Sequence, residues 1–258
     1  MPASSPNPDE LPFVAPCRAL PASAPFAWLR AGWADLRRAP APSLAYGLLI
    51  AGLGALIAWA ATRLGVLALY MGLASGFVFV GPFLAMGLYS ISYQLGRGLR
   101  PTLAFSLFEG RSHLRDTLVV GLALLVVLLV WARAATIMSV FRPDAAYPDW
   151  RDLIPYFGIG SVVGAVFSAI VFSATAFSLP MLLDRRADGI TAVVTSVNAS
   201  LRNKKAMVVW GALIFGCVLV GFATFFVAFV VLMPLIGHAT WHAYRATIDA
   251  SAWPPTHD

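Results

Sequence analysis

Long apolar runs alternate with short polar segments along most of the chain. Apolar stretches of about 18 residues or more are long enough to cross the hydrocarbon core of a bilayer, which is about 30 Å thick. The pattern predicts six transmembrane helices, at about residues 43–62, 64–95, 117–135, 156–183, 206–220 and 222–244. The expected fold class is therefore an all-α membrane protein.

The last apolar run allows two interpretations. It extends from Ala206 to Tyr244, and as one helix at about 1.5 Å per residue it would be nearly twice as long as the bilayer core is thick. We expect a turn at residues 221–224, because Gly221 tolerates the backbone dihedral angles of a tight turn. The alternative is one long helix that projects from the membrane.

Three polar segments that precede apolar runs share a pattern. Residues 28–37, 106–115 and 193–202 each end in Leu-Arg. Apolar residues of the first and third segments recur at helical spacing, which is typical of amphipathic helices at a membrane surface. These residues are Phe26, Leu29, Trp33 and Leu36 in the first segment, and Ile190, Val193, Val194, Val197 and Leu201 in the third. The expected architecture is three helical hairpins, each preceded by a cytoplasmic amphipathic helix; the alternative is that the pattern recurs by chance.

The membrane domain is expected to cover residues 26–247. Residues 1–25 are rich in proline and predict a disordered N-terminal tail, and residues 248–258 form a C-terminal tail. The first apolar run starts after residue 42, so no cleavable signal peptide is expected and the first span itself should direct insertion.

The charged residues predict the orientation. Hydrophobic residues make up 59% of the chain and charged residues 12%, about half the charged fraction of a soluble domain. On the predicted topology, 14 of the 18 Lys and Arg residues fall on one side of the membrane. The positive-inside rule places that side, with both termini, in the cytoplasm. The net charge of +6 therefore fits membrane anchoring, and no nucleic-acid partner is expected.

Two histidines are the candidate ligands for a metal or a haem. His238 and His242 are four residues apart and hence on one helical face, a spacing that can hold a metal. No Cys, Asp or Glu lies within a turn of them, so the alternative is that they form hydrogen bonds at the cytoplasmic interface. No cofactor is expected, with haem or metal as the minor alternative.

Prolines and glycines are the candidate structural residues of the spans. Pro82, Pro180 and Pro234 each fall in the second span of a hairpin and predict helix kinks, which a transporter or channel could use. Two pairs of glycines at G-x-x-x-G spacing predict close helix packing. The pairs are Gly72 with Gly76 and Gly160 with Gly164.

Catalytic motifs are missing from the sequence. It contains no G-x-S-x-G, phosphate-binding loop, H-E-x-x-H or paired membrane carboxylates, so no catalytic residue is assigned. The leading hypothesis is a non-catalytic accessory or assembly component of a membrane complex, in contact with lipid and with other membrane subunits. The alternatives are a small transporter or channel that uses the proline-kinked helices, and a redox accessory protein that binds haem or metal at His238 and His242.

Three motifs resemble those of a known family. Residues Val80–Tyr89, Phe177–Arg185 and Gly237–Arg245 resemble the bacterial integral membrane family catalogued as domain of unknown function 2189, over roughly residues 26–247. The resemblance implies a six-span protein of the bacterial inner membrane. Some members are labelled cytochrome c oxidase subunits, but a haem-copper core needs about six histidine ligands and this chain has four histidines, too few for the catalytic subunit.

Overall fold

The computed structural model describes residues 12–64, 67–103, 106, 114–141 and 149–256. Within these ranges the regular structure is helical, and β-pairing is limited to isolated bridges at Cys17 with Ile248 and Arg185 with Pro255. The helices are α1 (Ala24–Arg38), α2 (Pro40–Leu64), α3 (Leu67–Gly96), α5 (Leu114–Met138), α6 (Trp150–Thr175), α7 (Ser178–Asp184), α8 (Gly189–Arg202), α9 (Lys204–Ala223) and α10 (Phe229–Thr247), with a short 3-10 turn, η3 (Ser139–Phe141), after α5.

Four segments are long and apolar enough to cross a membrane. Within the described residues they are Pro40–Ala60, Arg115–Met138, Trp150–Asp184 and Lys204–Ala223. The all-helical class predicted from the sequence is thereby confirmed. The arrangement as six spans in three hairpins goes beyond these four segments and remains a proposal.

Local sequence signals mark several helix starts. Pro40 opens α2, at a position where its missing N–H and fixed φ angle suit a helix. Asp149 and Asp152 form a capping box at the start of α6, and the Asp149 N–H donates to the Asp152 carboxylate at 3.0 Å. The Asp188 carboxylate accepts from the N–H groups of Ile190 and Thr191 and caps α8.

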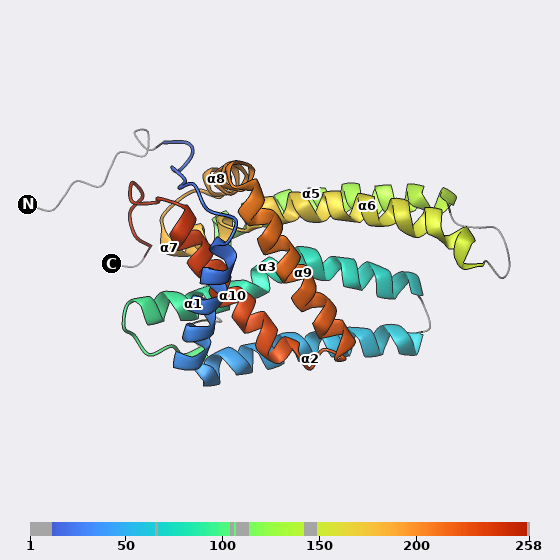
Figure 1. Cartoon of the computed structure of the whole chain (residues 1–258), viewed down its shortest axis with the longest axis horizontal. Coiled ribbons are helices and arrows are strands. Elements are labelled where there is room, and N and C mark those ends of the chain that lie inside the picture. Colours follow the sequence, from blue (N-terminus) through green and yellow to red (C-terminus); the bar gives the residue numbers. More distant parts are fainter. Residues whose placement is uncertain (1–11, 65–66, 104–105, 107–113, 142–148, 257–258) are drawn as a thin grey trace, which may run out of the picture.

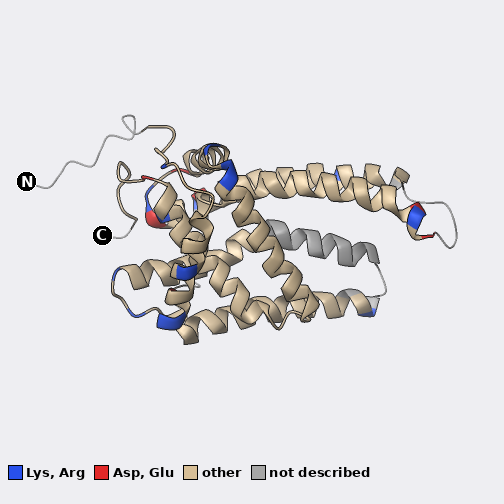
Figure 2. Ribbon diagram, viewed as in Figure 1, with Lys and Arg blue, Asp and Glu red and all other residues tan. Residues whose placement is uncertain are grey.

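Helix α10 is the centre of one group of helices. This helix packs against α1, α2 and α3, and it also touches α7 and α9. The α2–α3 and α5–α6 pairs run antiparallel, while α1 and α8 lie across the ends of these pairs (Figure 1). Most Lys and Arg residues gather at this same end, and the far end of the α5–α6 pair carries a smaller group of both signs (Figure 2).

Aromatic pairs and short side chains hold the helices together near the ends of the spans. The rings of Trp28 in α1 and Trp210 in α9 meet edge to face at 5.8 Å, and Tyr93 in α3 meets Trp241 in α10 at 5.7 Å. Glycines let backbones approach closely, because a Cβ on Gly47 of α2 would lie 2.1 Å from the Val230 carbonyl oxygen.

The turn in the last apolar run lies later than predicted. Two helices are present, but the connection comprises residues 224–228 rather than 221–224. Phe225 and Phe226 adopt positive φ angles of 49° and 70°, while Gly221 stays in α9. An added Cβ on Gly221 would lie 1.9 Å from the Phe229 ring, so this glycine serves close packing between α9 and α10.

Residues 12–25 make specific contacts with the helices, although a disordered tail was predicted for residues 1–25. Ala15 is buried and its N–H donates to the Thr195 hydroxyl at 3.0 Å. The Arg18 N–H donates to the carbonyl of Thr247 at 2.8 Å. These long-range contacts order a proline-rich segment whose composition alone gives no reason to fold.

Two of the three predicted amphipathic helices are present, as α1 and α8. In α1, Trp28 and Leu36 face the protein, while Phe26 and Trp33 are exposed. In α8 the buried face consists of small and hydroxyl residues, and Leu201 lies on the exposed face. The middle segment, residues 106–115, falls largely outside the described residues.

Candidate functional site

A chain of buried polar side chains lies where α1, α2, α3 and α10 meet. Close backbone contacts bring these helices together: an added Cβ on Gly32 of α1 would lie 2.7 Å from the Ala239 nitrogen, and one on Gly237 of α10 would lie 2.7 Å from Leu88 of α3. Side chains that reach across the junction therefore have to be short or well matched.

His238 occupies the centre of this junction. Its Nε2 lies 2.9 Å from the Ser43 hydroxyl of α2, and its Nδ1 lies 2.8 Å from the Ser92 hydroxyl of α3. His238 and Ser43 are 0% exposed and Ser92 is 1% exposed. Both ring nitrogens are thus satisfied by hydroxyl groups, as the burial of a polar ring requires.

Asp35 and His242 continue this series of hydrogen-bonded side chains to the protein surface. The His242 Nε2 donates to the Asp35 carboxylate at 2.7 Å, and Asp35 is 5% exposed whereas the His242 side chain is 32% exposed. Burial alone would raise the pKa of Asp35, but hydrogen bonds from His242 and Ser92 outweigh it, and the pKa lies below its ordinary value. Arg38, one turn further along α1, approaches the same carboxylate at 3.9 Å.

The hydrogen bonds can be assigned one consistent direction. The ionised Asp35 accepts only, so Ser92 donates to it and accepts from the His238 Nδ1–H, which leaves Nε2 to accept from Ser43. The order Ser43, His238, Ser92, Asp35 matches a serine activated by a histidine base and an acid. Ser43 is fully buried, however, so no substrate carbonyl can reach its hydroxyl in this conformation.

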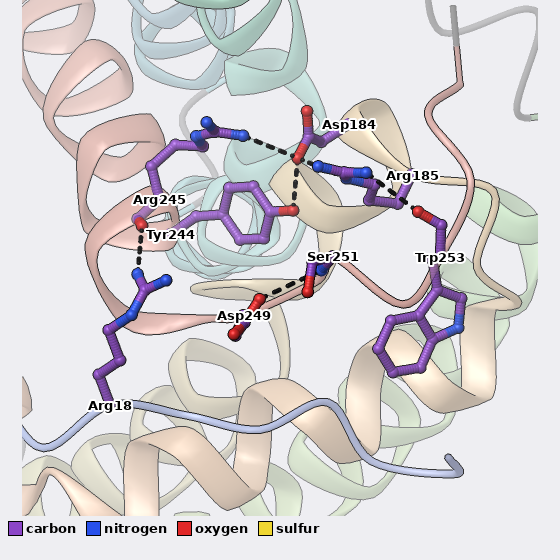
Figure 3. A network of polar contacts seen from close by, with 8 residues as sticks. All are labelled: Arg18, Asp184, Arg185, Tyr244, Arg245, Asp249, Ser251 and Trp253. Carbon is purple, nitrogen blue, oxygen red and sulfur yellow. Dashed lines mark hydrogen bonds and ion pairs between the residues drawn. The ribbon is translucent and has the colours of Figure 1, made fainter. Parts of the chain in front are cut away.

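A second polar network surrounds Asp184 at the end of α7 (Figure 3). One carboxylate oxygen, Oδ2, accepts from the Tyr244 hydroxyl at 2.8 Å and from the guanidinium groups of Arg185 and Arg245 at 3.2 and 3.3 Å. Arg185 also donates to the Trp253 carbonyl at 3.0 Å. Asp184 is 6% exposed, so the two arginines and the tyrosine compensate the burial of its charge.

The same network fastens both chain termini. Arg18 of the N-terminal segment donates to the Arg245 carbonyl at 3.1 Å, as Figure 3 shows. The Arg186 N–H donates to the Pro254 carbonyl and the Thr256 N–H to the Asp184 carbonyl, at 2.9 and 3.1 Å. The N-terminal segment, α7, α10 and the C-terminal segment therefore form one packed cap.

The two histidines predicted as ligands belong to the same series of hydrogen-bonded side chains. His238 contacts two serines, and His242 contacts Asp35. Within the described residues, no group of three His, Cys, Asp or Glu side chains could hold a metal ion. The binding of haem or metal at His238 and His242 is not tested by this geometry and remains a prediction.

The three prolines occupy different positions in their helices. Pro82 and Pro234 lie inside α3 and α10. Pro180 is the third residue of the short helix α7, where a missing N–H interrupts no bond within the helix. The helix is interrupted at residues 176–177, between α6 and α7, about one turn before Pro180. The role of the three prolines as helix kinks stays a prediction.

Two glycine pairs were predicted to pack helices closely, and that role stays a prediction. A Cβ on Gly160 or Gly164 would meet no heavy atom of the described residues within 4 Å, so no described helix packs closely on this part of α6. Gly72 and Gly76 lie in α3, in a stretch whose side-chain surroundings are not described. Tight approaches occur at other glycines, which lie outside the G-x-x-x-G pairs: Gly32, Gly47, Gly54, Gly87, Gly189, Gly221 and Gly237.

The sequence interpretation missed Asp35, Ser43 and Ser92. One signal for Asp35 was present, because it follows Trp28 by two helical turns and hence lies on the face of α1 that packs against the protein. A carboxylate on such a face predicts a buried partner. No comparable signal marks Ser43 or Ser92, since serine is common in spans.

The fold and these networks define a helical integral membrane protein with a polar cap at one end. Residues 69–184 match the family model described as "Predicted integral membrane protein (DUF2189)". This match, over α3 to α7, agrees with the family expected from the sequence motifs, while the motif at residues 237–245 lies outside the matched segment. No curated protein and no solved structure matches the chain significantly.

Proposed function

We propose that the protein is a six-span component of the bacterial inner membrane with both termini in the cytoplasm. The concentration of Lys and Arg around α1, α7 and α8, at the end that holds both termini, supports this orientation through the positive-inside rule. In this arrangement the spans are α2, α3, α5, the α6–α7 pair, α9 and α10. The cap around Asp184 then faces the cytoplasm.

The protein acts, in this proposal, as a non-catalytic accessory or assembly component of a membrane complex. The observation that carries the proposal is the exposure of α5. Only 11% of the apolar stretch of Arg115–Met138 is buried within the chain, compared with 33% for Pro40–Ala60 and 22% for Lys204–Ala223. The helix therefore offers most of its circumference to lipid or to another membrane protein.

The other helix of the same hairpin favours a protein occupant. Gly160 and Gly164 leave the α6 backbone uncovered, with no atom of the described residues within 4 Å of an added Cβ. Small residues at this spacing let the backbone of a neighbouring helix approach closely, whereas lipid chains gain nothing specific from glycine. We infer that a transmembrane helix of another protein packs on the α5–α6 hairpin.

The polar networks fit this role better than a catalytic one. Ser43, His238 and Ser92 are buried and bonded to one another. The Asp184 carboxylate likewise accepts a hydrogen bond from Tyr244 and forms ion pairs with Arg185 and Arg245. Both networks fix helices relative to one another and leave no free nucleophile or acid.

The test is crosslinking from defined positions in cells. A photoreactive amino acid placed at Leu122 or Leu129 of α5, which are 63% and 61% exposed, should capture one discrete membrane protein. The matched control is Phe215 of α9, which is 63% exposed and should capture none. Capture at all three positions, or at none, would contradict the proposal.

A substitution then decides whether the captured protein is a specific partner. Gly164→Leu adds a side chain where the chain itself has open space, so the protein should fold normally and lose the partner on purification. Gly216→Leu on α9, also with no atom within 4 Å, is the control and should keep the partner. Retention of the partner by Gly164→Leu would show that the contact lies elsewhere.

A proton-coupled transporter is the second candidate, favoured by the buried Asp35 and His238. Ionisable groups buried between helices of a membrane protein often mark proton pathways. Vesicles that contain the purified protein should then dissipate an imposed pH gradient faster than vesicles with Asp35→Asn. Equal rates in the two preparations would remove this candidate.

A further inference from the structure

Helix α8 has two unlike faces. Its inner face carries small and hydroxyl residues, among them Thr195, Ser196 and Ala199, which are buried. On its outer face, Ile190 and Leu201 are each 58% exposed, with half-buried valines between them. The apolar side of this amphipathic helix therefore points away from the protein.

A basic corner follows directly where α8 turns into α9. Arg202, Lys204 and Lys205 are exposed, and none of them has an ion-pair partner among the described residues. The sequence contains no Asp or Glu between residues 189 and 248, so no acidic residue of α8, α9 or α10 neutralises the corner. Within the described part of the chain, the cluster therefore carries a charge of +3 without an acidic partner.

The position of α8 relates these two features to the bilayer. The helix is seen end-on in Figure 1, while α5 and α6 run across the picture, so α8 lies roughly perpendicular to this pair. If α5 and α6 cross the membrane, α8 lies along its surface. The span α9 begins at Lys204, so the basic corner lies where the chain enters the lipid.

We propose that α8 and the corner Arg202–Lys205 form a binding surface for anionic phospholipids of the cytoplasmic leaflet. The exposed apolar face inserts among the acyl chains near the headgroups, and Arg202, Lys204 and Lys205 bind the phosphate groups. An apolar stripe next to unpaired basic residues, on a helix parallel to the surface, is the arrangement by which interfacial helices hold charged lipid. The inference rests on the orientation proposed above.

The lipid preference can be measured with the full-length protein in detergent micelles. Native mass spectrometry should detect bound phosphatidylglycerol in preference to phosphatidylcholine. Each basic residue near a charged leaflet strengthens binding about fivefold, so the triple variant Arg202→Gln, Lys204→Gln, Lys205→Gln should bind phosphatidylglycerol at least tenfold more weakly. Its binding of phosphatidylcholine should not change.

The matched control removes the same charge at the opposite end of the molecule. Arg63→Gln, Arg133→Gln, Arg151→Gln changes three exposed arginines of the predicted periplasmic side. This variant should keep the preference for phosphatidylglycerol. An equal loss in both variants, or no loss in the first, would overturn the assignment.

A depth measurement tests the apolar face independently of the charges. A nitroxide attached at Leu201→Cys, in a chain whose Cys17 and Cys217 are replaced by serine, should in liposomes be accessible to oxygen and shielded from a water-soluble nickel reagent. Accessibility to nickel, or shielding from both reagents by a protein neighbour, would overturn the proposal. A reporter fusion after Lys204 tests the orientation separately, so a wrong orientation is distinguishable from a wrong lipid site.

Discussion

His238 illustrates how a buried polar residue is made tolerable. Its Nε2 is hydrogen-bonded to Ser43 and its Nδ1 to Ser92, and all three side chains are buried. A buried donor or acceptor that loses its partner costs about 1–3 kcal/mol. The stability of this junction therefore depends on all three residues together.

Replacement of His238 tests this dependence. His238→Ala should lower the free energy of unfolding by about 3 kcal/mol or more, because it removes the partner of the Ser43 hydroxyl, takes the His238 donor away from Ser92 and opens a cavity. Thermal unfolding in detergent measures the effect. The triple variant Ser43→Ala, His238→Leu, Ser92→Ala should recover part of the lost free energy of unfolding, since it leaves fewer buried polar groups unpaired. No recovery would mean that packing alone matters at the junction.

Asp35 should make stability depend on acid pH. Its pKa in the folded protein lies below the ordinary value of 3.8, so its contribution is present above about pH 4 and is lost as the pH falls through the folded pKa. The midpoint of unfolding, measured in detergent across the acid range, should fall below about pH 4. The same scan on Asp35→Asn should lack this component, and an identical acid response in both proteins would rule the assignment out.

At the scale of helices, close glycine contacts set how the elements pack. Gly47 of α2 faces the Val230 carbonyl of α10 so closely that a Cβ would lie 2.1 Å from its oxygen. Backbone atoms cannot move aside as a flexible side chain can. Five residues further along α2, Gly52 has no atom within 4 Å.

These two glycines form a matched pair for mutation. Gly47→Ala should destabilise the protein by about 1–3 kcal/mol through overpacking against α10. Gly52→Ala should leave stability unchanged or raise it by up to about 1 kcal/mol, because alanine favours a helix. Unfolding of both variants in detergent gives the comparison, and similar effects of the two substitutions would contradict the packing of α2 on α10.

Packing of aromatic side chains sets where α9 ends and α10 begins. Glycine at position 221 was the conformational signal for a turn, yet two phenylalanines adopt the positive φ angles instead. The rings of Phe222, Phe226 and Phe229 meet at centroid distances of 5.4–5.8 Å, and Gly221 provides the space for Phe229. Contacts between aromatic rings offset the strain of the turn.

For the whole molecule, the proposed topology makes one decisive prediction. Periplasm-sensitive reporters fused after Asp149 and after Lys204 should report opposite sides, because the α6–α7 pair crosses the membrane once between them. A reporter after Thr256 should report the same side as the one after Lys204, since α9 and α10 cross together. Opposite sides for these last two fusions would mean that α10 does not span the membrane.

The sequence by itself determined the helical membrane class, the approximate limits of the apolar helices and the family. These depend on the length and period of hydrophobic runs, which are local properties of the chain. Tertiary structure decided the ordered N-terminal segment, the glycines that pack and the partners of His238. Ser43, Ser92 and His238 lie on different helices far apart in sequence, and they meet only because glycines allow those helices to approach closely, an outcome of three-dimensional packing that no local pattern encodes.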